Sequence, residues 1–178
     1  MGTLDIVGTS SPNLARAYPD AHVDGYDLDA ASVDAARRHA AEHGLADRVT
    51  FSHADAATVP LEQGYDLVTA FECIHDMPDP VSVLAAARRL VKDTGAVVVM
   101  DEKVPEAFSG PGDPVEQLMY GISMIVCLPD GMSHEGSVGT GTVMRAATLR
   151  SYALQAGFRD VEVLPIEHDM FRFYRLLH

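Results

Sequence analysis

The sequence predicts an α/β fold in which a mostly parallel sheet is covered by helices and ends in an antiparallel hairpin. Short apolar runs alternate with segments of helical periodicity along most of the chain, which is typical of a parallel sheet. Near the C-terminus, the apolar runs 161–166 and 171–176 flank a polar turn at 167–169, which predicts the hairpin. With 178 residues and 47% apolar composition, the chain is the right size for a single domain, 1–178.

The elements of the parallel part follow one another in βα order. Strands are predicted at 4–7, 22–28, 49–52, 66–71 and 96–101. A helix over 31–43 places its small apolar residues on one face and stops at Gly44, a residue suited to a helix C-cap. A second helix, over 81–91, follows Asp79 as its cap and Pro80 as its first residue.

The last third of the chain departs from this pattern. Asp113 and Pro114 predict a helix start, and apolar residues continue at helical spacing to Val126. The methionine-rich stretch 119–132 is interpreted mainly as core packing, with a substrate pocket or subunit interface as the alternative. Four glycines in 131–141 predict a mobile loop, and a final helix covers 146–156. We therefore expect a substrate or lid insertion at about 105–144 within the single domain.

Charge and composition exclude several classes of partner. Thirteen basic and 26 acidic residues leave a net charge of −13, which would repel a nucleic-acid backbone. No apolar run is long enough to span a membrane, and no signal peptide is evident. Cys73 and Cys127 lack a CxxC spacing and are expected to be buried thiols in a reducing compartment. We expect a cytoplasmic protein without nucleic-acid or membrane partners.

The interval from Gly8 to Asp27 indicates a nucleotide-binding βαβ unit. In such units the loop after strand one lies against the ligand, and an acid at the end of strand two holds both ribose hydroxyls. The acid is present as Asp27, but the loop carries one glycine where two or three are usual. Ser11 and Pro12 follow the loop as a predicted N-cap and first helical residue, so a helix N-terminus still faces the ligand.

The chain resembles the class I S-adenosylmethionine-dependent methyltransferases. The resemblance lies in Leu4-Asp5-Ile6, Gly25-Tyr26-Asp27-Leu28-Asp29, His53-Ala54-Asp55-Ala56, Tyr65-Asp66-Leu67-Val68 with Phe71-Glu72, and Gly95-Ala96-Val97-Val98-Val99. It implies a Rossmann-like, doubly wound sheet of seven strands, mostly parallel, in three αβα layers. It also implies S-adenosylmethionine as cofactor and S-adenosylhomocysteine as product.

The resemblance further implies which residues bind the cofactor. Asp27 would accept hydrogen bonds from the ribose, Leu28 would pack on the adenine, and Asp55 would accept from the adenine amino group. The remaining implied cofactor residues are Asp5, Gly8, Ala56 and Phe71. The alternative is that Asp27 and Asp55 only cap helices or lie solvated at strand ends. The loop has fewer glycines than in the family, and the helix after it is about one turn shorter. Both changes are expected to weaken binding at the methionine end of the cofactor.

His75 is the candidate catalytic residue. It follows strand four in Cys73-Ile74-His75-Asp76, which resembles the His-Asp of small-molecule O-methyltransferases, where the histidine takes a hydroxyl proton. The alternative is that His75 positions the turn, because methyl transfer from a sulfonium depends mainly on alignment. Glu72 is a weaker candidate at the same edge. No metal is expected, and His39-Ala40-Ala41-Glu42-His43 is interpreted as a solvated helix face rather than a zinc site.

These observations favour a methyltransferase that acts on an oxygen or nitrogen of a small molecule, and the apolar stretch 119–132 leaves a homodimer open. Two alternatives remain open. The first is a degenerate methyltransferase fold that serves as a binding or scaffold protein, because the first motif is altered. The second is an NAD-dependent oxidoreductase, which explains Gly8 and Asp27 but neither Asp55 nor the antiparallel ending.

Overall fold

The structure is a computed structural model that describes residues 2–6, 10–59, 64–108, 110 and 112–178, with the backbone alone for 2–6. The chain forms two compact units. The first comprises Met1–Phe71 and Ala86–Val98, and the second comprises Glu72–Ala85 and Val99–His178. Strand β5 (Val91–Glu102) and helix α3 (Pro80–Leu90) each contribute residues to both units. Gly8 of the predicted cofactor loop lies outside the described residues.

The first unit is built on parallel strands. They are β1 (Gly2–Ile6), β2 (His22–Asp27), β3 (Val49–His53) and β4 (Tyr65–Phe71), followed by the first residues of β5. Strand β1 pairs with both β2 and β4, and β2 pairs with β3, all in parallel. The order in this unit is β3-β2-β1-β4-β5. The parallel α/β architecture predicted from the alternating pattern is therefore confirmed.

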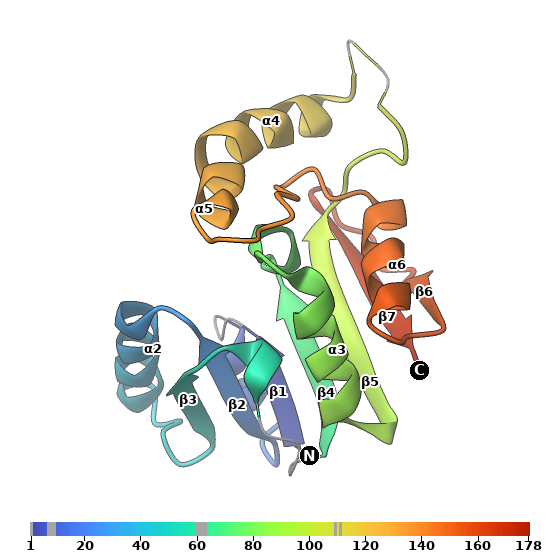
Figure 1. The fold of residues 1–178 in the computed structure, drawn as a ribbon. Coiled ribbons are helices and arrows are strands. Elements are labelled where there is room, and N and C mark those ends of the chain that lie inside the picture. The colour runs from blue at the N-terminus through green and yellow to red at the C-terminus, as the bar shows by residue number, and fades with distance from the viewer. Residues whose placement is uncertain (1, 7–9, 60–63, 109, 111) are drawn as a thin grey trace. The chain divides into compact units, whose positions relative to one another are not determined.

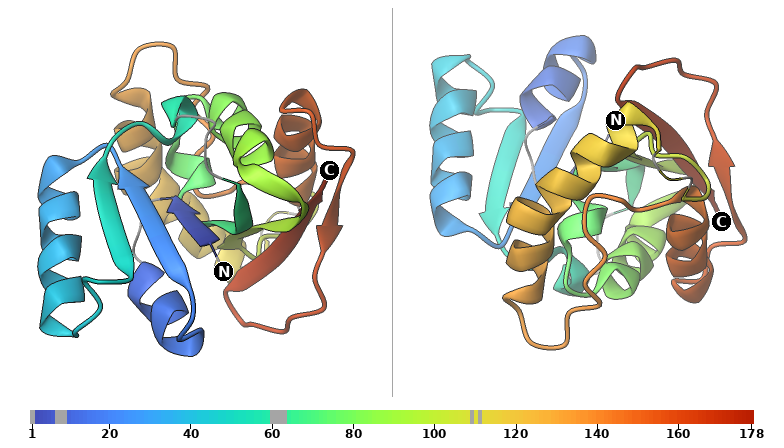
Figure 2. Two further views of the ribbon diagram at one scale, coloured as in Figure 1. Left: turned by 90° about the horizontal axis from the view of Figure 1, so that it is seen from below. Right: turned by 90° about the horizontal axis from the view of Figure 1, so that it is seen from above.

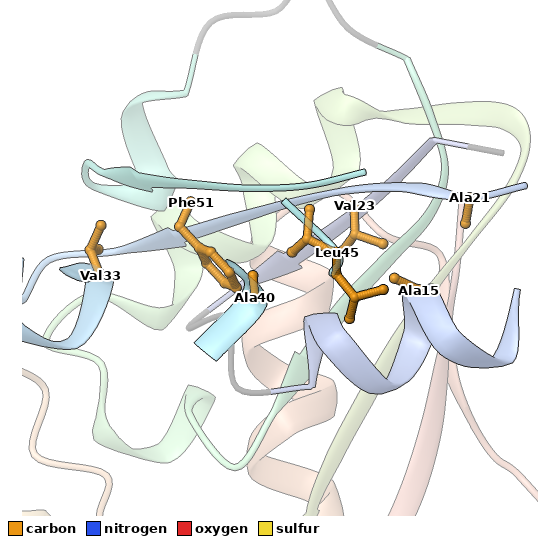
Figure 3. Packing of buried hydrophobic residues seen from close by; sticks show 8 residues of the cluster. Ala15, Ala21, Val23, Val33, Ala40, Leu45 and Phe51 are labelled. Carbon is orange, nitrogen blue, oxygen red and sulfur yellow. The ribbon is translucent and has the colours of Figure 1, made fainter. Parts of the chain in front are cut away.

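Helix α2 (Ala30–Glu42) covers one face of β2 and β3, as both views of Figure 2 show. Asp29 caps it, because its side chain accepts hydrogen bonds from the Ser32 amide and hydroxyl. Gly44 ends it with a φ of 66°, in the left-handed region that glycine tolerates best. The buried residues Val33 and Ala40 of α2 pack with Val23, Leu45 and Phe51 and with small neighbours (Figure 3).

Helix α1 (Ser11–Ala17) starts differently from the prediction. Ser10, not Ser11, is the N-cap residue, and its side chain makes no capping hydrogen bond. Ser11 is the first helical residue and is completely buried, and Pro12 follows it inside the first turn. The sequence rule placed proline at the first helical position, but the second position also tolerates it because that amide lacks an intrahelical acceptor.

The second unit contains the antiparallel pair. Strand β6 (Asp160–Val163) pairs with β7 (Phe171–Leu177), and Asp160 lies opposite Leu177. The order here is β5-β7-β6, and the Lys103 amide donates to the Met170 carbonyl at 2.7 Å. The two C-terminal strands pair in the antiparallel sense as predicted, and the first of them ends three residues early. Helix α6 (Ala146–Gln155) lies beside β6 and buries Leu149 and Ala153 (Figure 1).

A continuous helical segment replaces part of the predicted loop in this unit. Helix α4 (Pro114–Ile122) passes into a π-helical turn, η3 (Ser123–Cys127), and then into α5 (Leu128–Met132). Gly131 is therefore helical rather than the start of a loop. A Cβ at Gly131 would lie 2.9 Å from the Asp76 carbonyl oxygen, so the glycine permits a close backbone approach.

The methionine-rich stretch is not core, contrary to the main interpretation. Only Met119, Ser123, Cys127 and Gly131 are buried between 119 and 132, whereas Met124 and Ile125 are more than 70% exposed. The buried residues recur every fourth position, and the π-helical turn keeps this narrow row facing inward.

Candidate functional site

The predicted ribose and adenine acids lie at neighbouring strand ends of the first unit. Asp27 is the last residue of β2, and its register partner in β3 is His53. The Ala54 amide donates to the Asp27 carbonyl at 3.0 Å, which places Asp55 just beyond the same edge. The carboxyl ends of parallel strands are where open α/β sheets bind ligands.

Both acids also have local structural roles. One oxygen of Asp27 accepts from the Asp29 amide at 2.8 Å, and one oxygen of Asp55 accepts from the Ala57 amide at 2.8 Å. Both side chains are half-buried. Within the described part of the chain, the second oxygen of each carboxylate has no hydrogen-bond partner. The capping role therefore leaves each acid one oxygen for a ligand.

The other predicted cofactor residues are placed as follows. Leu28 follows Asp27 directly and is 57% exposed. Ala56 is buried at the start of the short 3-10 helix η1 (Ala56–Thr58), and Phe71 is half-buried at the end of β4. The backbone of Asp5 lies in β1, opposite Gly25 of β2 and Thr69 of β4.

A second group of functional side chains surrounds His75 in the second unit. The chain turns sharply at Glu72, which has a φ of 56° although it is not glycine. Its amide donates to the Met100 carbonyl of β5 at 3.0 Å. His75 follows in the short 3-10 helix η2 (Ile74–Asp76) and is 3% exposed. Such left-handed residues cost about 1–3 kcal/mol and often occur at functional sites.

Three carboxylates surround the His75 ring. Nδ1 lies 2.9 Å from an oxygen of Asp101, with which it forms a hydrogen bond, and 3.4 Å from an oxygen of Glu102. Nε2 lies 3.3 Å from Asp76. Asp101 and Glu102 are the last two residues of β5 and are both buried. Consecutive strand residues usually point to opposite faces, but here both reach one imidazole nitrogen.

Burial and mutual repulsion shift the pKa values of this group. Burial alone would lower the pKa of His75, but the hydrogen bond and charge of Asp101, with Glu102 and Asp76, raise it to about 10. Burial, with the neighbouring Asp101, raises the pKa of Glu102 to about 9 and that of Glu72 to about 7. At neutral pH the His75 imidazole is therefore protonated on both ring nitrogens and positively charged.

A small cavity adjoins His75. Its lining includes Asp76, Cys127, Leu128 and Thr140, and it is open to solvent on one side. It has no room for a molecule even of the size of water, so a substrate would have to widen it. The Gly141 amide donates to the His75 carbonyl at 3.0 Å, which fixes the loop 137–141 over the turn that carries the histidine.

A buried ion pair supports the same unit. Glu116 of α4 is 1% exposed and pairs with Arg145, the residue before α6. The Arg145 guanidinium also donates to the Pro105 carbonyl and to the Tyr120 hydroxyl. This pair joins the helical segment 114–132 to the rest of the second unit.

The sequence identified His75 and noted Glu72, but it did not identify Asp101, Glu102 or the pair formed by Glu116 and Arg145. A usable signal existed for Asp101 and Glu102. Both end the strand at 91–102, just as Asp27 ends β2. For Glu116, the sequence showed only an acid in a capped first turn.

Comparison with known proteins identifies the family. The methyltransferase domain family matches residues 7–124. The chain belongs to this family. This match confirms the resemblance to class I S-adenosylmethionine-dependent methyltransferases. It also argues against the alternative that the chain is an NAD-dependent oxidoreductase. The details of the glycine-poor loop fall at residues 7–9, outside the described part of the chain.

Two curated relatives illustrate the methyltransferase similarity. The 27-O-demethylrifamycin SV methyltransferase of Amycolatopsis mediterranei is 28% identical over 142 residues, which is 76% of this chain and 52% of the relative. The ubiquinone biosynthesis O-methyltransferase of Aromatoleum aromaticum is 36% identical over 168 residues, covering 91% of this chain and 64% of the relative. The chain therefore spans between half and two thirds of these relatives.

Solved structures share the methyltransferase fold. The mitomycin 7-O-methyltransferase MmcR superposes with a TM-score of 0.74 at 18% identity, over 99% of this chain and 48% of that one. An O-methyltransferase family protein from Burkholderia thailandensis gives a TM-score of 0.72 at 18% identity, over 99% and 50% respectively. At this identity the similarity shows the Rossmann-like α/β fold.

Proposed function

We propose that this chain transfers a methyl group from S-adenosylmethionine to an oxygen or nitrogen of a small molecule and releases S-adenosylhomocysteine. Family membership supports the reaction class, and both curated relatives described above are methyltransferases of small molecules by name. The net charge of −13 supports a small substrate rather than nucleic acid. The observation that carries the proposal is the pair of half-buried acids, Asp27 and Asp55, at adjacent parallel strand ends.

These strand ends fit the adenosine part of the cofactor. Asp27 has one oxygen without a partner among the described residues, where it would accept from ribose hydroxyls. Leu28, exposed beside it, offers an apolar surface for an adenine ring. Asp55 and the Ala56 amide would bind the edge of that ring, and Phe71, at the end of β4, would pack against the cofactor. Asp5 and Gly8 are proposed at the methionine end.

The cofactor, when bound, supplies an electrophilic methyl group on a sulfonium. The chain's own residues then have to orient the acceptor and exclude water. We propose His75 as the catalytic residue, because it lines the cavity described above. Asp101 holds Nδ1–H at 2.9 Å and fixes the ring. For Nε2 to accept a proton from the acceptor, its own proton must first move to Asp76, 3.3 Å away.

The test is a methyl-transfer assay with a panel of phenols, alcohols and amines, in which S-adenosylhomocysteine is detected by mass spectrometry. We expect at least one acceptor to be methylated. His75→Ala should lower kcat far more than it weakens binding of S-adenosylhomocysteine, whereas His22→Ala, an exposed control on β2, should change neither. Cofactor binding without turnover on any acceptor would instead favour the scaffold alternative.

Several finer features belong to the same proposal. We propose that the strand orders of the two units continue through β5 as one doubly wound, seven-stranded sheet in three layers that ends in the hairpin. The chain would then be a single domain with a substrate insertion at about 105–144. A cytoplasmic location and a homodimer are also proposed, and sedimentation velocity would measure the latter. In the described residues no helix is long and apolar enough to cross a membrane.

A further inference from the structure

We propose that His75, Asp101 and Glu102 form a binding site for a divalent transition-metal ion. One ring nitrogen and one oxygen from each carboxylate lie within 4.8 Å of one another. The Nδ1 atom is 2.9 Å from the Asp101 oxygen and 3.4 Å from the Glu102 oxygen. Ligands bound at about 2.1 Å and separated by 90–110° are about 3.0–3.4 Å apart, so both distances suit a shared ion.

Unpartnered buried oxygens are the second observation that indicates a ligand. Oδ2 of Asp101 and Oε2 of Glu102 have no hydrogen-bond partner among the described residues. These side chains are 0% and 5% exposed respectively, so water does not reach them freely. A buried polar oxygen without a partner costs about 1–3 kcal/mol, and more when charged. The unpartnered Oε2 of Glu102 is the oxygen that lies 3.4 Å from Nδ1, whereas Asp101 approaches Nδ1 with its other oxygen, Oδ1. An absent cation would account for the buried Glu102 oxygen without a hydrogen-bond partner.

The charge around the three ligands is also unbalanced. Glu72 and Asp76 add two further carboxylates, each with one buried oxygen that lacks a hydrogen-bond partner within the part of the chain that is described. No lysine or arginine in that part forms an ion pair with any of these four acids. Among the residues that the structure describes, the imidazole is the one cationic group in contact with the cluster. The raised pKa values of Glu102 and Glu72 reflect burial and repulsion between neighbouring acids, which a divalent ion would relieve.

The remaining ring nitrogen has the environment of a metal-bound histidine. Histidine ligands usually direct the second ring nitrogen at a carboxylate or carbonyl oxygen, which fixes the ring. Here an Asp76 oxygen lies 3.3 Å from Nε2. One imidazole with two carboxylates suits Mn²⁺, Fe²⁺ or Zn²⁺ better than Ca²⁺, which prefers oxygen ligands alone.

This inference goes beyond the proposed methyl transfer and assigns Nδ1 a different partner. In base catalysis Nδ1 keeps its proton and donates to Asp101, whereas with an ion bound the same nitrogen is a ligand. Metal binding without cofactor or acceptor tests the inference alone. Failure to bind a metal would leave the methyltransferase proposal intact, and absence of methyl transfer would leave the metal site intact.

The experiment titrates the EDTA-treated full chain with Mn²⁺ and follows the free ion by electron paramagnetic resonance. We expect one Mn²⁺ per chain and a rise in Tm on binding. Asp101→Asn and Glu102→Gln should each weaken binding about tenfold or more. Glu106→Gln makes the same charge change at a side chain that is 65% exposed, and it should leave the affinity unchanged.

Two further variants exclude other sites. A Zn²⁺ titration is run in the His43→Ala background, because His39 and His43 are exposed with ring centroids 4.3 Å apart and could bind zinc themselves. Cys127→Ser tests the neighbouring group of His75, Asp76 and Cys127. We expect it to keep its affinity, and loss of binding in this variant alone would overturn the assignment to Asp101 and Glu102.

Folding of the variants is checked by circular dichroism and thermal melting without metal. Without metal, the raised pKa of Glu102 keeps this acid protonated, so Glu102→Gln replaces one neutral group with another. The metal-free variant should therefore melt near the wild-type temperature while losing its response to Mn²⁺. The inference is wrong if wild type binds neither ion up to millimolar concentration. It is also wrong if both folded carboxylate variants bind like wild type.

Discussion

Replacing Asp27 with asparagine should weaken the binding of S-adenosylhomocysteine without unfolding the first unit. The substitution keeps an oxygen that can accept the Asp29 amide, which is 2.8 Å away in the wild type. It replaces the oxygen proposed to accept from the ribose with a neutral NH2 group, which can only donate to the hydroxyl oxygens. The variant therefore separates the ligand role of Asp27 from its local structural role.

The size of the effect follows from the hydrogen bonds at stake. A hydrogen bond to a charged group contributes about 1.5–3 kcal/mol, against about 0.5–1.5 kcal/mol for a neutral one. Two ribose hydroxyls would each lose about 1–1.5 kcal/mol, for a total of about 2–3 kcal/mol. Because 1.4 kcal/mol corresponds to a factor of ten, Kd should rise about 30- to 150-fold.

Isothermal titration calorimetry measures this change directly. Asp24→Asn is the matched control, because it makes the same charge change on the same strand, where Asp24 accepts from the Tyr65 hydroxyl at 3.0 Å. The control should bind with a Kd within about threefold of wild type. An unchanged Kd in a folded Asp27→Asn protein would refute the placement of the ribose.

Three further predictions concern stability. Glu116→Ala removes a buried carboxylate from the partly exposed Arg145, which keeps the Pro105 carbonyl and the Tyr120 hydroxyl as acceptors. It should lower the free energy of unfolding by about 1–3 kcal/mol in urea titrations, whereas Glu106→Ala, at a carboxylate that is 65% exposed, should cost below about 1 kcal/mol. Equal losses would contradict the role given to the buried pair. Gly131→Ala would place Cβ 2.9 Å from the Asp76 carbonyl oxygen and should lower Tm. Gly121 in α4 is the control, because a Cβ there meets no atom within 4 Å. Gly121→Ala should therefore raise Tm, since alanine has the higher helix propensity. Identical shifts would show that the close approach is not rigid. Burial raises the pKa of Tyr65 in the folded protein above its usual value near 10. Above pH 10 the unfolded chain therefore loses the Tyr65 proton while the folded protein keeps it. The free energy of unfolding should then fall by about 1.4 kcal/mol per pH unit. Tyr65→Phe should remove that slope and Tyr18→Phe should not, and an unchanged slope in Tyr65→Phe would contradict the assignment.

The parallel half of the fold could be predicted because each of its elements carries a local signal. The apolar runs, the cap at Asp29 and the stop at Gly44 are readable from neighbouring residues alone. The antiparallel ending could be predicted for the same reason. The helical segment 114–132 was harder, because a π-helical turn lets its buried residues recur every fourth position instead of at the 3.6-residue period of an α-helix.

The site divides in a similar way. Asp27 and Asp55 follow from strand order, because parallel strands bring their carboxyl ends to one edge. The environment of His75 cannot be predicted from strand order, because both Asp101 and Glu102 at the end of β5 lie against the same ring nitrogen. Strand alternation places consecutive residues on opposite faces and argues against that convergence.

The central claim is that the strand ends at Asp27 and Asp55 bind the adenosine part of S-adenosylmethionine. Calorimetric titration of the full chain with S-adenosylhomocysteine tests this claim most directly, and titration with NADH is the comparison. We predict saturable binding of one S-adenosylhomocysteine per chain and none of NADH. Absence of binding at millimolar S-adenosylhomocysteine would contradict the claim.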